Sequence, residues 1–138
     1  MAEAFYFDDV TVGATAESPG RTLTETDLVQ YKGLAGEWES GSSDGKAVPD
    51  LVALCVSSGL TWRLPLPPLA ILAFRGFEWT FLQPLRVGDT IRCRVTTVAK
   101  RAAQDGGVLI EKREILNQRN EVVQTGKVTY LVARRPLP

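Results

Sequence analysis

The sequence contains no histidine among its 138 residues. This absence removes the most common general base, the most common metal ligand and the usual activator of serine or cysteine nucleophiles. If the protein is an enzyme, its proton transfers must depend on carboxylates, tyrosine, lysine or cysteine. We therefore expect neither a metal nor another cofactor.

An excess of charge of either sign is also missing, since 16 basic residues balance 16 acidic ones. Without a net field, we expect no nucleic-acid partner and no attraction to an anionic membrane surface. The longest apolar stretch, residues 48–64, is too short to span a membrane and carries Asp50 and Arg63. No basic segment followed by an apolar one opens the sequence, so we expect no signal peptide and a cytoplasmic location.

Cysteine is scarce, with only Cys55 and Cys93 present. Both lie in apolar segments, which predicts reduced core residues and no disulfide framework. Cys55 has no histidine that would activate it as a nucleophile.

The most prominent feature that is present is the apolar stretch Val48–Leu64. It is apolar on nearly every side, which is typical of a helix buried in a core. Pro49 and Asp50 suit a first helical turn, and prolines at positions 65, 67 and 68 end the helix. Ser57, Ser58 and Gly59 form a notch of small residues where another backbone or a ligand has room to approach.

The remaining sequence predicts one more helix and a sheet. Thr24 suits a helix N-cap, and Gly33 and Gly36 lie near the expected end of that helix. Strands are expected over residues 69–82, 90–100, 108–117 and 121–132, joined largely by tight turns. We therefore predict one α+β domain over residues 1–138, with an antiparallel sheet wrapped around a long central helix, which is the hotdog arrangement.

Several blocks of sequence carry a resemblance to a known family. They read YFDDVTVG, SPGRTLTETDLVQYKGLAGEW, FEWTFLQPLRVGDTIRCRVTTVAKR and GGVLIEKREILNQRNEVVQTGKVTYLV. Together they resemble the MaoC-like dehydratases, the R-specific enoyl-thioester hydratase branch of the hotdog superfamily, over nearly the whole chain. The resemblance implies addition or removal of water on an acyl chain carried by coenzyme A or acyl carrier protein. It also implies a homodimer, which would cover the unpaired edge of the sheet.

The family's catalytic motif is replaced here. That motif reads Gly-Asp-x-Asn-Pro-x-His, whereas this chain has GEWESGS over residues 36–42. Glu37 falls where the aspartate belongs, and Ser42 falls where the histidine belongs. A serine hydroxyl cannot replace imidazole as a base near neutral pH, because it hardly ionises. The family's His-Gly near the start of the central helix is missing as well.

Two carboxylates remain as candidate catalytic residues, Glu37 and Asp50. Desolvation beside Trp38 would raise the pKa of Glu37 into a useful range, although a plain surface acid fits the position too. Asp50 lies where hotdog thioesterases often use an acidic residue, but it also suits simple compensation of the helix dipole. If the two carboxylates face one cavity, they would work as an acid and base pair.

Candidate substrate-binding residues are aromatic or small and polar. Large aromatic side chains serve core packing before ligand binding, and a serine on a buried helix permits close packing against a sheet. The candidates are Tyr31, Trp38, Ser42, Ser57, Trp62 and Trp79.

Three functions remain open on these residues. The first is a divergent lyase or cyclase that acts on an acyl or polyketide-type substrate through carboxylate acid–base chemistry. The second is a non-catalytic acyl-thioester-binding subunit that pairs with an active hydratase. The third is an acyl thioesterase that uses Asp50 or Glu37.

Overall fold

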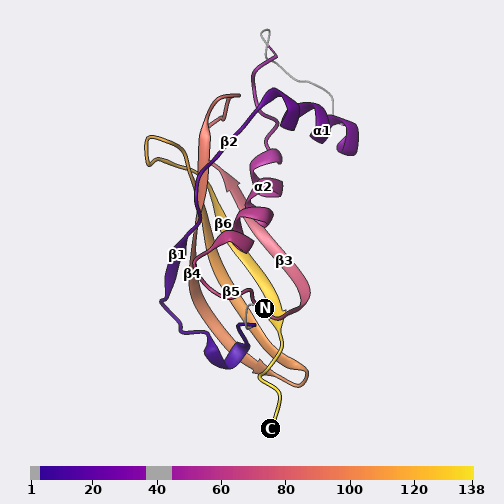
Figure 1. Ribbon diagram of the computed structural model, residues 1–138, viewed down its shortest axis with the longest axis vertical. Coiled ribbons are helices and arrows are strands. Elements are labelled where there is room, and N and C mark those ends of the chain that lie inside the picture. The colour runs from indigo at the N-terminus through magenta and orange to yellow at the C-terminus, as the bar shows by residue number, and fades with distance from the viewer. Residues whose placement is uncertain (1–3, 37–44) are drawn as a thin grey trace.

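A computed structural model describes residues 4–36 and 45–138 (Figure 1). The central helix (Val52–Leu60) lies against one side of an antiparallel six-stranded sheet, and the helix Glu25–Ala35 packs against the central helix. The strand order is β1-β4-β5-β6-β3, and β2 also pairs with β4. The helices are η1 (Phe7–Asp9), α1 (Glu25–Ala35), α2 (Val52–Leu60) and η2 (Thr61–Arg63), of which η1 and η2 are 3-10 helices. The strands are β1 (Thr15–Glu17), β2 (Arg21–Thr22), β3 (Ile71–Phe81), β4 (Thr90–Ala103), β5 (Gly106–Leu116) and β6 (Val122–Val132). This confirms the predicted α+β architecture.

Helix α1 begins and ends as its sequence predicts. The Thr24 hydroxyl accepts a hydrogen bond from the Asp27 N–H (3.2 Å), and the Asp27 carboxylate accepts one from the Thr24 N–H (2.9 Å). This reciprocal pair satisfies two backbone donors that have no partner inside the helix. The helix ends at Gly36, which has a left-handed conformation (φ 66°) that glycine adopts without strain.

The central helix α2 is shorter than predicted. It begins at Val52, so Pro49 and Asp50 precede it, and after Leu60 it tightens into η2. The Val48 N–H donates to the Leu85 carbonyl (3.0 Å), and the Gln124 side-chain amide donates to the Asp50 carbonyl (3.2 Å). These bonds tie the segment before the helix to the sheet side of the molecule, which explains why the helix does not start at residue 48.

Only one side of α2 is buried, which corrects the expectation of a helix buried all round. Val52, Ala53, Ser57 and Leu60 are buried, whereas Cys55 is exposed. The sheet covers one side of the helix, whereas Ser58 and Gly59 on the other side are exposed like Cys55. The prediction of a buried Cys93 is confirmed, and burial raises the pKa of its thiol to about 12. Among the described residues, no helix has the length and apolar character needed to cross a membrane.

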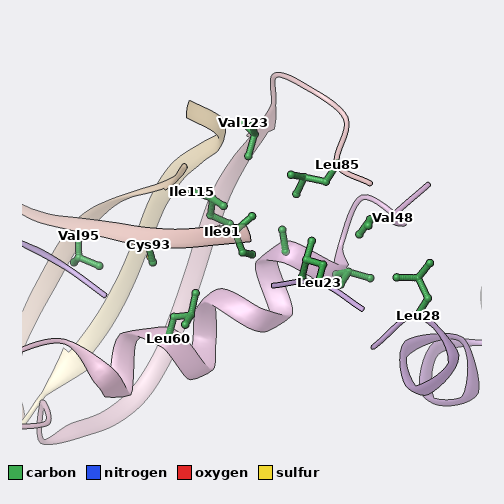
Figure 2. Close-up of a cluster of buried hydrophobic side chains, with 12 residues drawn as sticks. Leu23, Leu28, Val48, Leu60, Leu85, Ile91, Cys93, Val95, Ile115 and Val123 are labelled. Atoms are coloured by element: carbon green, nitrogen blue, oxygen red, sulfur yellow. The ribbon is translucent and has the colours of Figure 1, made fainter. Parts of the chain in front are cut away.

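The interior holds two apolar clusters that lie one after the other along the sheet. The larger one joins both main helices to β4, β5 and β6 (Figure 2). The smaller one lies beyond it, near η1, and includes Phe7, Val10, Leu109, Val128, Tyr130 and Val132. Between the two clusters, β5 turns Glu111 and Arg113 toward the interior, and both are buried.

Strand β3 forms one edge of the sheet and leaves apolar side chains uncovered. The alternation in the sequence placed Phe74 on the face opposite Phe77. A register shift between Phe74 and Gly76 instead sets Phe74 beside Tyr130, and the Phe74 and Phe77 rings lie 6.0 Å apart. Phe74 is 57% exposed and Phe77 is 52% exposed. The edge of the sheet therefore carries an apolar surface that none of the described residues covers.

Candidate functional site

A cavity of about 160 Å³ lies at the C-terminal end of α2. Its walls come from the segment before β1, from residues 61–71, and from the inner faces of β4, β5 and β6. Most of the wall is apolar, with side chains such as Leu64, Leu69, Val95 and Leu109. One water molecule needs about 10–15 Å³ by this kind of measure, so the cavity has room for a short acyl group.

Several polar side chains interrupt this apolar wall, and three of them, Thr97, Glu111 and Tyr130, come from β4, β5 and β6. Thr97 and Glu111 are direct cross-strand partners between β4 and β5. Tyr130 pairs with Leu109, which lies two residues before Glu111 and so on the same face of β5. The sheet register therefore gathers a hydroxyl, a carboxyl and a phenol on one patch of the cavity wall.

Glu111 is the most unusual member of this patch. It is only 6% exposed, and its carboxylate accepts no hydrogen bond from the described residues. The Arg113 guanidinium lies 3.9 Å away, which is an ion-pair distance but too long for a hydrogen bond. Burial raises the pKa of the Glu111 carboxyl above its usual range, and the positive charge of Arg113 offsets only part of that rise. Near neutral pH this carboxyl is therefore protonated more often than an exposed glutamate.

Arg113 lies behind the cavity wall and is 2% exposed. Its guanidinium donates to the Ser57 hydroxyl (3.2 Å) and to the Tyr130 hydroxyl (2.6 Å). The Ser57 hydroxyl in turn donates to the Leu54 carbonyl within α2 (2.7 Å). Arg113 thus links the central helix to β6, and it sets the electrostatic environment of Glu111 from behind.

The sequence predicted neither Glu111 nor Arg113 as a site residue, although a signal for them exists. Residues 109, 111, 113 and 115 share one face of β5 and read Leu, Glu, Arg and Ile. Two opposite charges flanked by apolar residues at the same parity indicate charges that face the interior.

The residues that the sequence did propose are scattered. Trp62 lies at the cavity mouth and is 62% exposed. Ser57 is buried behind the wall. Tyr31 lines a separate groove of about 390 Å³ between α1 and α2. Their roles in substrate binding stay predictions.

Trp79 lies on the inner face of β3 and outside both cavities. Its indole N–H donates to the Gln124 side-chain oxygen (2.9 Å), and its ring passes over Gly126 so closely that a methyl group there would collide with it. These contacts give Trp79 a packing role and explain the glycine beside it.

The predicted carboxylate pair is not brought together in the described part of the chain. Asp50 is exposed in the turn before α2 and lines neither cavity. Glu37, Trp38 and Ser42 lie outside the described residues. A joint role for Glu37 and Asp50 stays a prediction.

Comparisons with known proteins bear on both fold and family. No protein-family model matches the chain. The protein MaoC of Klebsiella aerogenes is 28% identical over 106 residues, which cover 69% of this chain and 31% of that relative. The chain thus spans about a third of the length of the curated relative that it matches.

Solved structures match over almost the full chain. A monoamine oxidase regulatory protein from Archaeoglobus superposes with a TM-score of 0.86 at 27% identity, covering 99% of both chains. A MaoC-like dehydratase from Rhodospirillum rubrum gives a TM-score of 0.79 at 26% identity, covering 97% of this chain and all of the other. A Mycobacterium tuberculosis protein with a double hotdog fold gives a TM-score of 0.82 at 21% identity, and the match covers 96% of this chain and 45% of that one. The hotdog fold and the resemblance to MaoC-like dehydratases are confirmed.

Proposed function

We propose that this protein is a lyase that adds water to, or removes it from, an acyl or polyketide-type thioester. The chain has the hotdog fold and resembles MaoC-like dehydratases. The observation that carries the proposal is Glu111, a buried carboxyl without a hydrogen-bond partner among the described residues, which faces an apolar cavity large enough for a short acyl group. A carboxyl that faces the cavity and accepts no hydrogen bond from the described residues is available to a bound ligand.

The chemistry needs one group that can both take and give a proton. In dehydration, the Glu111 carboxylate removes the proton from the carbon next to the thioester carbonyl. The same carboxyl then gives this proton to the β-hydroxyl group as its C–O bond breaks, so water leaves and a carbon–carbon double bond forms. A carboxyl with a raised pKa suits both steps, since general acid–base catalysis is most effective when the pKa lies near the working pH.

We also propose that two copies of the chain pair along β3. Strand β3 ends the sheet on one side and carries Phe74, Phe77 and Phe81 in exposed positions, and Leu82 directly after it is exposed as well. An open strand edge with apolar side chains is prone to pair with another chain, and symmetric pairing of two copies covers both edges at once.

The catalytic proposal is tested with crotonyl-CoA, a four-carbon enoyl thioester, and purified protein. Loss of absorbance of the conjugated double bond measures hydration. We expect the wild type to hydrate the probe and Glu111→Gln to be at least about 100-fold slower. Glu114→Gln is the matched control, because Glu114 lies on the other face of the same strand and pairs with Arg94. Full activity of Glu111→Gln, or no activity of the wild type toward any enoyl or hydroxyacyl thioester, overturns the proposal.

A second candidate function is a non-catalytic subunit that completes the acyl site of an active hydratase. The complete lack of histidine and the uncovered β3 edge favour it. It requires that the chain be inactive alone and pair with a histidine-bearing hotdog chain on co-expression. A stable homodimer that hydrates crotonyl-CoA contradicts it. Release of free thiol from the same probe would instead indicate the thioesterase alternative.

A further inference from the structure

We infer that Tyr130, held by Arg113, donates a hydrogen bond to the carbonyl oxygen of an acyl group bound in the cavity. The inference assigns a ligand-binding residue to the cavity described above and rests on the proposed function only for the reaction that follows binding.

The hydrogen bonds that the Tyr130 hydroxyl makes and lacks support this role. A guanidinium group only donates hydrogen bonds, so in the 2.6 Å contact Arg113 donates and the phenol oxygen accepts. The phenol proton must then point away from Arg113. No acceptor for that proton exists among the described residues, although Tyr130 lines the cavity. A carbonyl oxygen that enters the cavity supplies the missing acceptor.

The Tyr130 ring is held firmly enough to aim this proton. It packs edge-on against Phe74, with the ring centres 5.7 Å apart, and it belongs to the smaller apolar cluster. Burial raises the pKa of its hydroxyl, and the nearby charge of Arg113 acts against that rise. The hydroxyl thus stays protonated as a donor, while the guanidinium behind it strengthens the bond that it offers.

The role of Tyr130 is tested by binding, measured by rapid mixing before hydration of the probe proceeds. Two probes are compared: crotonyl-CoA, and S-(2-butenyl)-CoA, in which a methylene replaces the carbonyl. We expect the thioester to bind about tenfold tighter than the thioether, and Tyr130→Phe to reduce this preference to about twofold or less. Tyr6→Phe is the matched control, because Tyr6 lies outside the cavity wall and stacks against Arg135.

The infrared spectrum of carbonyl-labelled crotonyl-CoA gives a second readout. We expect bound probe to show a carbonyl stretch below its value in hexane, and Tyr130→Phe to move it back toward that value. A bound wild-type signal equal to that in hexane overturns the inference even if the variant does not fold. An unchanged thioester preference in a folded Tyr130→Phe protein also overturns it.

Failure of this inference and failure of the proposed function give different results. If Glu111→Gln keeps full hydration activity while Tyr130→Phe loses the thioester preference, the lyase mechanism is wrong and the carbonyl contact stands. If the reverse holds, Glu111 carries the chemistry and the carbonyl is bound elsewhere.

Discussion

The two ends of helix α2 each lie near a carboxyl group, and the two groups differ in their exposure to solvent and in the residues around them. At the N-terminal end, Asp50 is exposed in a turn and faces neither described cavity. At the C-terminal end, Glu111 is buried in an apolar wall beside Arg113. Figure 1 shows α1 near the first of these ends, whereas the second end points away from α1.

The contrast shows two different grounds for choosing a catalytic carboxyl, namely its position in a sequence motif and its chemical environment in the fold. Glu37 and Asp50 were selected because the resemblance places the family's catalytic residues at that end. Glu111 is selected because water is excluded around it, and exclusion of water is what shifts the proton affinity of a carboxyl. The first argument identifies a location, whereas the second identifies a group with altered chemistry.

The largest expected effect decides between the two ends directly. Glu111→Gln should slow hydration of crotonyl-CoA by about 10²–10⁴-fold, because it removes the proposed proton carrier. The double variant Glu37→Gln/Asp50→Asn should stay within about threefold of the wild type. Initial rates at saturating probe measure both. The opposite ranking would return the active site to the N-terminal end and contradict the comparison.

The next effect concerns stability. Arg113→Ala should lower the free energy of unfolding by about 3–5 kcal/mol, because it leaves a buried carboxyl without its counter-charge and two hydroxyls without their donor. Urea denaturation of the folded protein measures this. Arg92→Ala is the control, since its ion pair with Glu17 is partly exposed and contributes about 1 kcal/mol at most. Equal losses in the two variants would show that Arg113 is not buried.

A smaller loss should follow from cutting the link between Arg113 and the helix. Ser57→Ala removes the acceptor of one guanidinium bond and should destabilise the fold by about 1.5–3 kcal/mol. Ser58→Ala, next to it on the exposed side, should change stability by less than about 0.5 kcal/mol. Thermal melts of the two variants, run side by side, check the difference.

The most gradual effect is the dependence of stability on pH. Burial raises the pKa of Glu111, so the folded state binds its proton more tightly than the unfolded state does. The stability that this proton contributes is complete below the unfolded pKa near 4.5 and is lost as the pH rises through the higher folded pKa. Glu111→Gln should lack this loss, so it should gain stability relative to the wild type as the pH rises. Denaturation at pH 4, 6 and 8 tests this, and parallel curves would contradict a raised pKa.

Local signals in the sequence predicted much of the fold. The Thr24 cap, the Gly36 terminus and the last three strands follow from short-range hydrogen bonding and alternation, and the structure confirms them. The start of α2 did not follow, because Leu85 and Gln124 hold the preceding segment from distant parts of the chain. The sheet face predicted for Phe74 was wrong, because a register shift in β3 reverses the alternation of side chains at that point.

The candidate site was less predictable than the fold. A charged residue on a strand is normally assigned to the solvent side, and an isolated strand does not reveal which side another element will cover. Glu111 becomes a candidate only because the segment over residues 61–71 and the chain before β1 close above it. That closure depends on contacts distant in sequence, which alternation alone does not encode.

Glu111 and Arg113 lie between the two apolar clusters, and this placement also limits how far a bound acyl chain can extend along the helix. A charged layer across a hydrophobic interior works as a partition, since an acyl chain cannot pass a guanidinium without stripping it of its partners. A hotdog chain with small apolar residues at these two positions would leave space between the clusters, and the cavity would extend farther along the helix. Chain-length selectivity would then be adjustable at two positions of a single strand, while the surrounding framework stays unchanged.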